Sequence, residues 1–181
     1  MKMLARVTMW VALAAAQTST VTVAEASEAV SGSDREQLVI LLRHAEKALD
    51  QGKDPGLTGV GEARAQSLRG VLEHANVAAI ITTEWQRTRA TAAPIAAALN
   101  ITPVIVDTSA SAADRHAGQV ATAVRAQTAD VVLVVGHSNT VPAIIEALGG
   151  PAVAAIGDDD YDNLFLLWRR RGEVRLIQAR Y

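Results

Sequence analysis

The chain has 181 residues, 50% of them hydrophobic and 20% charged, with a net charge of −2 at pH 7. At about 100–200 residues per domain, this length predicts one domain with enough apolar residues to fill a core, which excludes a mainly disordered protein. The near-neutral charge argues against a broad nucleic-acid-binding surface. The absence of cysteine excludes disulfides, thiolate nucleophiles and cysteine-ligated metal sites.

Residues 1–26 have the order of a secretory signal peptide. Two basic residues near the start precede an apolar run over 7–16, and small residues follow at Ala24 and Ala26. The apolar run is shorter than the roughly 20 residues that a membrane-spanning helix needs, so we expect no stable membrane anchor. The alternative is a disordered or amphipathic N-terminus of a cytosolic protein.

The signal pattern predicts an exported protein, periplasmic or secreted. The polar stretch over 27–36 contains glycine and serine and is expected to be a flexible lead-in. The remaining residues, 37–181, are expected to form the single domain.

Strand and helix patterns alternate along this domain. Strands are predicted at 38–42, 77–82, 103–106 and 131–135; the runs 38–42 and 131–135 are apolar throughout, and the first is expected to be buried on both faces. Helical patterns follow them, at 58–74, 85–99, 112–128 and 142–148. Pro94 is expected to kink or divide the second of these helices. Two last runs, at 164–168 and 174–177, flank Arg171-Gly172 and predict an antiparallel hairpin at one edge.

This alternation predicts an α/β fold, a three-layer α/β/α sandwich with a mainly parallel sheet. Ligands bind such sheets where loops leave the carboxyl ends of the strands. Arg43 and His44 follow the first apolar run, Arg87 lies beyond the second, and His137 follows the fourth. Two imidazoles and two guanidiniums at one edge would form an anion pocket, and phosphate suits it because arginine binds its oxygens in pairs.

Phosphoryl transfer through a histidine fits these residue types. A neutral imidazole whose one ring nitrogen is held by a hydrogen bond can attack phosphorus with the other. The cations and the second imidazole would bind the equatorial oxygens, over which negative charge spreads in the transition state.

Four motifs occur in order over about residues 38–145. They are Leu42-Arg43-His44-Ala45-Glu46-Lys47, Leu57-Thr58-x-x-Gly61-x-x-x-Ala65, Thr82-Thr83-Glu84-Trp85-Gln86-Arg87-x-x-x-Thr91-Ala92 and Gly136-His137-Ser138. Together they resemble the histidine phosphatase superfamily, or phosphoglycerate mutase-like proteins. The short chain is similar to the small exported phosphatases of that family, or to its compact phosphohistidine phosphatases.

The resemblance implies a histidine acid-type phosphatase that hydrolyses phosphomonoesters, or a phosphoramidate, through a phosphohistidine on His44. Arg43, Arg87 and His137 would bind the phosphate, and Ser138 would add to the substrate site. The expected partner is a small phosphorylated molecule, and no cofactor or metal is implied.

Many family members carry a carboxylic acid after the third strand that protonates the leaving group. Asp107 is the nearest candidate here, before Asp114 and Glu84. Because none stands in a recognisable acid motif, we expect an enzyme that prefers good leaving groups.

Two alternatives stay open: a catalytically weak module that binds a phosphate ligand, and a phosphomutase. The intact His44 argues against the first, and the lack of a long insertion that could serve as a lid argues against the second. A serine hydrolase is disfavoured because the segment 136–140 departs from G-x-S-x-G. A histidine-ligated metal is disfavoured because arginine beside each candidate ligand would repel a cation.

Structural roles are expected for the remaining conspicuous residues. His74 is expected at a helix end, where a cation favours the helix dipole. His116 is expected to be exposed. Trp85 is expected either at the pocket mouth or in the core, and the acidic run over 158–162 is expected to form a surface turn rather than a cation site.

Overall fold

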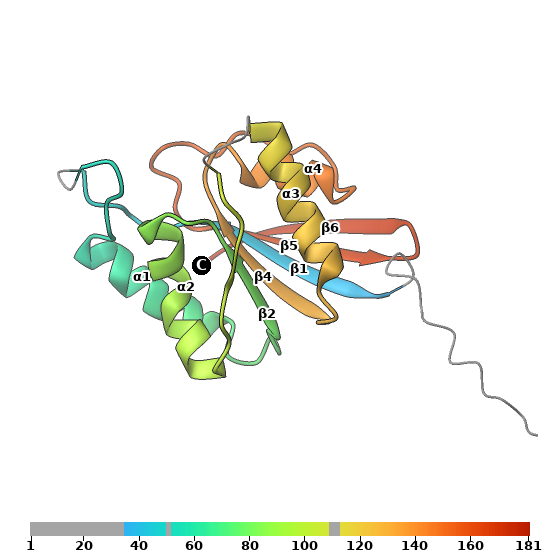
Figure 1. The fold of residues 1–181 in the computed structure, drawn as a ribbon, viewed down its shortest axis with the longest axis horizontal. Coiled ribbons are helices and arrows are strands. Elements are labelled where there is room, and N and C mark those ends of the chain that lie inside the picture. The colour runs from blue at the N-terminus through green and yellow to red at the C-terminus, as the bar shows by residue number, and fades with distance from the viewer. Residues whose placement is uncertain (1–34, 50–51, 109–112) are drawn as a thin grey trace, which may run out of the picture.

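The computed structural model describes residues 35–49, 52–108 and 113–181. The segment predicted to be a signal peptide, 1–26, lies outside these residues, as does most of the lead-in. Within the described ranges, six strands and four helices alternate in the expected order (Figure 1). No helix in this part of the chain is both long and apolar enough to cross a membrane.

The observed elements agree with the predicted ones to within a few residues. The strands are β1 (Gln37–Arg43), β2 (Ala79–Thr82), β3 (Val104–Ile105), β4 (Val131–Gly136), β5 (Asn163–Arg170) and β6 (Glu173–Arg180). The helices are α1 (Gly59–Val71), α2 (Gln86–Leu99), α3 (Ala113–Ala126) and α4 (Val141–Ala147).

Helix α2 runs through Pro94 as one element, so the expected division at that residue is wrong. Proline inside a helix removes a hydrogen bond at a cost of about 3 kcal/mol. The neighbours Ala92, Ile95 and Ala96 are buried against the sheet, and this packing holds the helix together on both sides of the proline.

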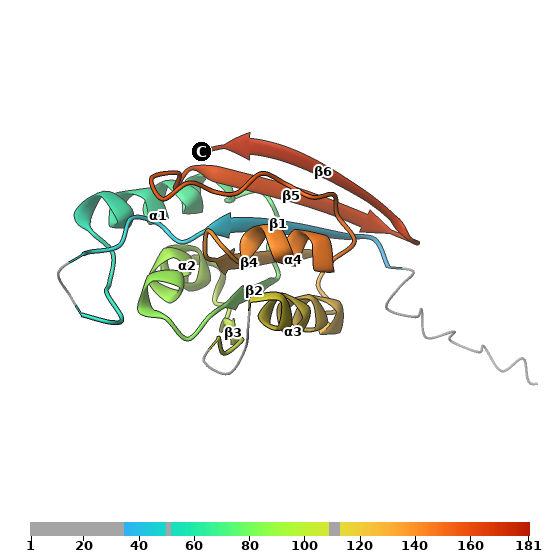
Figure 2. The same ribbon diagram turned by 90° about the horizontal axis from the view of Figure 1, so that it is seen from above.

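The sheet has the order β3-β2-β4-β1-β5-β6 (Figure 2). The first four strands of the chain are parallel to one another, whereas β5 runs antiparallel to β1 and pairs with β6. The predicted edge hairpin is therefore confirmed. Figure 2 shows it as the two long strands on one flank of the molecule.

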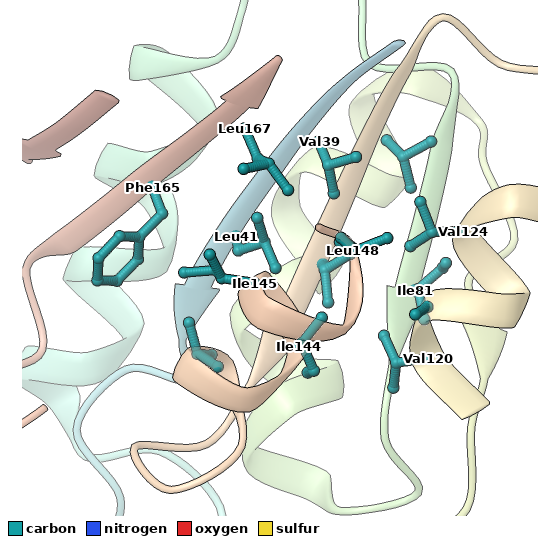
Figure 3. Close-up of a cluster of buried hydrophobic side chains, with 14 of the residues drawn as sticks. Val39, Leu41, Ile81, Val120, Val124, Ile144, Ile145, Leu148, Phe165 and Leu167 are labelled. Carbon is teal, nitrogen blue, oxygen red and sulfur yellow. The ribbon is translucent and has the colours of Figure 1, made fainter. Parts of the chain in front are cut away.

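Helices cover both faces of the sheet, which confirms the three-layer sandwich. Helices α3 and α4 pack on the face to which Val39 and Leu41 of β1 point, as Figure 3 shows. Helices α1 and α2 pack on the other face, against Ile40 and Leu42. Successive residues of a strand point to opposite faces. Burial of both faces therefore explains why this strand is apolar from Leu38 to Leu42.

The pairing of β1 with β4 sets the geometry of the candidate site. Arg43 lies opposite Gly136 in the register, and the amide of His44 donates to the Gly136 carbonyl at 2.9 Å. The first and fourth sequence motifs thus leave the sheet side by side, although more than ninety residues separate them.

Candidate active site

A pocket of about 360 Å³ opens at the carboxyl ends of the parallel strands. Its lining includes Arg43, His44, Arg87, His137 and Ser138. The structure therefore brings together all the residues that the sequence predicts for phosphate binding and for nucleophilic attack.

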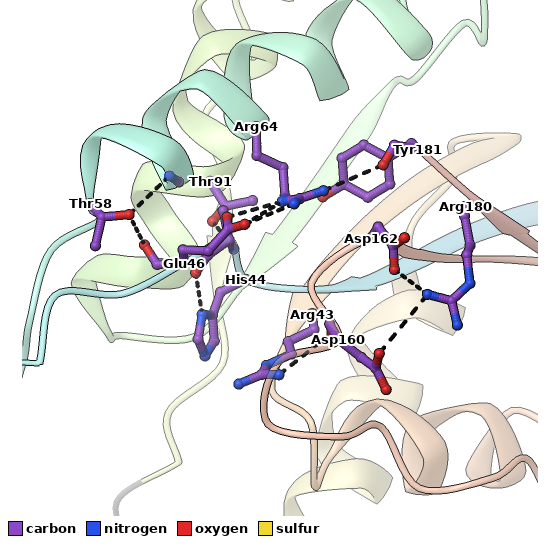
Figure 4. Close-up of polar contacts among 12 residues, drawn as sticks. Arg43, His44, Glu46, Thr58, Arg64, Thr91, Asp160, Asp162, Arg180 and Tyr181 are labelled. Carbon is purple, nitrogen blue, oxygen red and sulfur yellow. Dashed lines mark hydrogen bonds and ion pairs between the residues drawn. The ribbon is translucent and has the colours of Figure 1, made fainter.

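His44 is oriented by its own loop. Its Nδ1 lies 2.7 Å from the carbonyl oxygen of Ala45, which can only accept, so Nδ1 carries the proton and Nε2 keeps its lone pair. The Ala45 amide in turn donates to Thr91 Oγ1 at 2.9 Å, which ties this loop to α2 (Figure 4).

The environment of His44 keeps its ring neutral. The ring is buried, and this burial, together with the positive charges of Arg87, Arg43 and Lys47, lowers the pKa of His44 to about 4. The hydrogen bond to the Ala45 carbonyl opposes this shift without cancelling it. A neutral imidazole with a free Nε2 is the form that attacks phosphorus.

His137 faces His44 edge-on, with 5.4 Å between the ring centroids. Its Nε2 lies 3.2 Å from Thr83 Oγ1, which fixes the ring plane. Burial lowers the pKa of His137 to about 3, and the charges of Arg87 and neighbouring histidines act in the same direction. His137 is therefore neutral near pH 7 and can donate a hydrogen bond to a phosphate oxygen.

Arg43 is positioned by backbone carbonyls. It donates to the carbonyl oxygens of Gly157 at 2.7 Å and Asp158 at 2.8 Å, and its guanidinium stacks 4.0 Å from the ring centre of Tyr161. These contacts orient the guanidinium without adding a formal negative charge.

Arg87 stands in the first turn of α2, with its guanidinium 4.7 Å from the ring centre of Trp85. Trp85 lines the pocket and donates to Thr108 Oγ1 at 2.7 Å, so it lies at the pocket and not in the core. Within the described residues, neither Arg87 nor Arg43 forms an ion pair. Both guanidiniums are therefore available to an incoming anion.

The second sequence motif packs against the loop that carries His44. The Thr58 hydroxyl caps α1 by accepting from the Gly61 amide at 3.1 Å (Figure 4). The Thr58 amide donates to the Glu46 carbonyl at 2.9 Å. A Cβ on Gly61 would lie only 2.3 Å from that carbonyl oxygen. Only glycine allows α1 to come this close to the loop that carries His44.

The three carboxylates considered as acids have different placements. Asp107 is exposed and does not line the pocket, and the side chain of Asp114 lies outside the described residues. Glu84 accepts from the amide of Thr108 at 3.0 Å and from its hydroxyl, so it fixes a pocket residue instead of facing the pocket itself. Asp158, which the sequence analysis did not single out as an acid, lines the pocket from an exposed position.

The expectation that His116 is exposed is wrong. Its side chain is 1% exposed and lines the pocket. The reason is the register of α3, in which His116, Val120 and Val124 share the face that packs on the sheet. The four-residue spacing of these residues was the available signal. Lys47, the last residue of the first motif, also lines the pocket.

The acidic run forms a turn tied to the last strand. Asp160 accepts from the Gly157 amide at 3.1 Å, and Asp162 pairs with Arg180 at 2.6 Å. Among the described residues, no group of three or more His, Asp or Glu side chains is arranged to hold a metal ion. His74 is exposed just beyond α1.

Comparisons with known proteins agree with this geometry. The family model of the histidine phosphatase superfamily (branch 1) matches residues 39–119. A protein assigned as the phosphohistidine phosphatase SixA of Agrobacterium tumefaciens is 26% identical, with a TM-score of 0.61, over 80% of this chain and 98% of that chain. The search of curated proteins gives no match.

Two further solved structures share the fold. The protein histidine phosphatase SixA complexed with tungstate is 15% identical, with a TM-score of 0.61, over 80% of this chain and 97% of that chain. A mycobacterial glucosyl-3-phosphoglycerate phosphatase is 14% identical, with a TM-score of 0.59, over 81% and 99%. These two neighbours share the fold, and the family match together with the 26% identical SixA protein supports phosphatase activity in general. The four ordered motifs, the match of residues 39–119 to the family model and the shared fold all make this chain similar to the histidine phosphatase superfamily.

Proposed function

We propose that the protein hydrolyses phosphomonoesters, or a phosphoramidate, through a phosphohistidine on His44. One observation carries this proposal: a neutral, oriented imidazole with a free Nε2 faces a pocket whose two arginines pair with no carboxylate in the described structure. Such a pocket is suited to a dianion that is attacked from one side.

The reaction would take two steps. His44 Nε2 attacks phosphorus in line, the bond to the leaving oxygen or nitrogen breaks, and the phosphoryl group stays on His44. Arg43, Arg87 and His137 hold the three equatorial oxygens during the transfer. Water then attacks the phosphohistidine and releases inorganic phosphate and neutral His44.

The proposed substrate is a small phosphorylated molecule, met outside the cytoplasm if the N-terminal segment directs export. SixA relatives are named for phosphohistidine, so a phosphoramidate belongs in the test panel. Export would keep the chain from cytosolic phosphotransfer proteins, and for that reason we favour phosphomonoesters.

Trapping the intermediate tests the proposal. The chain without residues 1–26 is mixed with a reactive radiolabelled aryl phosphate and denatured, with parallel samples kept alkaline or acidified. We expect a label that survives alkali, is lost in acid and is absent from His44→Ala. A full rate in excess chelator is also expected, because no step uses a metal.

The outcomes separate the alternatives. A parent that binds inorganic phosphate but never turns over would support the binding module and contradict this proposal. A label that passes to a second phosphate acceptor faster than to water would support the phosphomutase.

A further inference from the structure

His116 is the one histidine of the pocket that the steps above do not use. Its ring is 1% exposed, and neither Nδ1 nor Nε2 has a hydrogen-bond partner in the described structure. Buried polar groups are nearly always paired, because desolvating them without a partner costs free energy. An unpaired imidazole in an anion pocket therefore points to a ligand that supplies the missing partner.

The packing of α3 holds this ring in place. His116 lies one turn before Val120 and two turns before Val124, and both valines are buried in the core under α3 (Figure 3). His116 and His137 line the same pocket. The ring thus lies on a rigid element beside the phosphate-binding residues.

We propose that His116 is a further catalytic residue, the acid that protonates the leaving oxygen. This inference rests on the proposed function. As His44 Nε2 forms its bond to phosphorus, the ester P–O bond breaks and the leaving oxygen takes a proton from the His116 imidazolium, so that an alcohol departs. When water attacks the phosphohistidine, its proton returns to His116 and inorganic phosphate is released.

Histidine is the side chain most often used for proton transfer in catalysis. The carboxylates are less well placed for it. Asp107 does not line the pocket, Glu84 is engaged with Thr108, and Asp158 lies exposed at the rim. His116 is the buried histidine of the pocket in which both ring nitrogens lack a partner within the described structure.

The test measures the first chemical step with two leaving groups. Release of leaving group is followed in the pre-steady state for para-nitrophenyl phosphate, which needs no acid, and for an alkyl phosphate such as glycerol phosphate. General acids contribute about a hundredfold to ten-thousandfold. We expect His116→Gln to lose about a hundredfold or more on the alkyl ester but less than about tenfold on the nitrophenyl ester.

Matched variants isolate the effect. His74→Gln changes an exposed histidine outside the pocket and should leave both rates unchanged. Asp107→Asn, Asp114→Asn, Glu84→Gln and Asp158→Asn test the carboxylates in the same assay. His116→Asn repeats the measurement if the glutamine does not fold, and phosphorylation of His44 by the nitrophenyl ester reports that the pocket is intact.

Equal losses on both esters would overturn the inference, because a phosphate-binding or structural residue acts regardless of the leaving group. Unchanged rates on both esters would overturn it too, as would an alkyl-selective loss in a carboxylate variant. Failure of the proposed function itself looks different: the parent would then form no phosphohistidine with either ester.

Discussion

The pocket and the Glu46–Arg64 pair adjoin the same loop, but their arginines differ in whether a carboxylate pairs with them. In the first, the pocket, Arg43 and Arg87 have no carboxylate partner in the described structure. In the second, Arg64 makes short hydrogen bonds to both carboxylate oxygens of Glu46, at 3.0 Å from its Nε and 2.8 Å from its Nη2. The loop that carries His44 and Glu46 joins the two regions.

In the pair of Glu46 and Arg64, the carboxylate and the guanidinium already satisfy each other's charge and hydrogen bonds. The Arg64 guanidinium also approaches the ring of Tyr181, whose pKa is raised by burial to about 12. The pocket arginines, by contrast, form no ion pair in the described structure. Arginines without an ion-pair partner, rather than charged residues as such, distinguish the candidate site in this fold.

The largest effect should come from His44→Ala. Because this change removes the nucleophile, kcat should fall by more than about a thousandfold, while the thermal unfolding temperature stays close to that of the parent. Steady-state turnover of an aryl phosphate and thermal unfolding measure the two quantities. Activity within tenfold of the parent would show that the pocket is not the reacting region.

Arg87→Lys should have the next largest effect. Lysine keeps the charge but loses the fork that binds two oxygens, and charged hydrogen bonds contribute about 1.5–3 kcal/mol each. We expect kcat/KM to fall about tenfold to a hundredfold. Arg89→Lys, on the exposed side of the same helix, should change it little. Equal losses in both variants would contradict the assignment of Arg87 to phosphate.

Protonation of His44 should abolish turnover only at an unusually low pH. His44 attacks only when neutral, and its pKa is lowered to about 4, mainly by burial. The parent should therefore keep its kcat/KM through mildly acidic pH and lose about tenfold per unit below the pKa. A pH–rate profile with an aryl phosphate measures this limb. A limb near the ordinary histidine pKa would contradict a desolvated nucleophile.

Glu46→Gln should affect stability more than turnover. Burial opposes ionisation of Glu46, but hydrogen bonds from Arg64 and from the backbone outweigh it and hold its pKa below the ordinary value. The pair then stabilises the fold above that ordinary value, and its contribution is lost as pH falls through the lowered one.

At neutral pH the loss should be about 1 kcal/mol, because the pair is partly exposed. Urea unfolding of parent and Glu46→Gln at neutral and acidic pH measures it, and the difference should shrink in acid. A large loss of kcat with unchanged stability would mean that the Glu46–Arg64 pair acts in catalysis and not only in stabilising the fold.

The smallest expected change is a gain in stability. His116→Leu replaces an unpaired buried ring with an apolar side chain, which removes a desolvation penalty of about 1–3 kcal/mol but leaves some mismatch in volume. We expect the thermal unfolding temperature to rise by a few degrees. A clear fall would show that the ring of His116 is a structural contact.

The sequence predicted the fold best where a strand is buried on both faces of the sheet. The apolar run of β1 and the motifs at the strand ends predicted the sheet and five of the pocket residues. His116 was missed because its neighbours Asp114 and Arg115 are charged, whereas the face of α3 is set by Val120 and Val124 further along. The placement of loop side chains such as Asp107 could not be predicted either, because their direction depends on tertiary contacts that sequence spacing does not encode.

The close approach at Gly61 couples the position of α1 to that of the loop that carries His44, so the first and second sequence motifs must move together. Because the Glu46 carbonyl would be only 2.3 Å from any Cβ there, a single added methyl group on α1 must displace the loop that carries the nucleophile. Gly61→Ala would thus act on His44 at a distance, with no atom of residue 61 lining the pocket. An engineer who wished to tune this nucleophile without touching the pocket would begin at that helix.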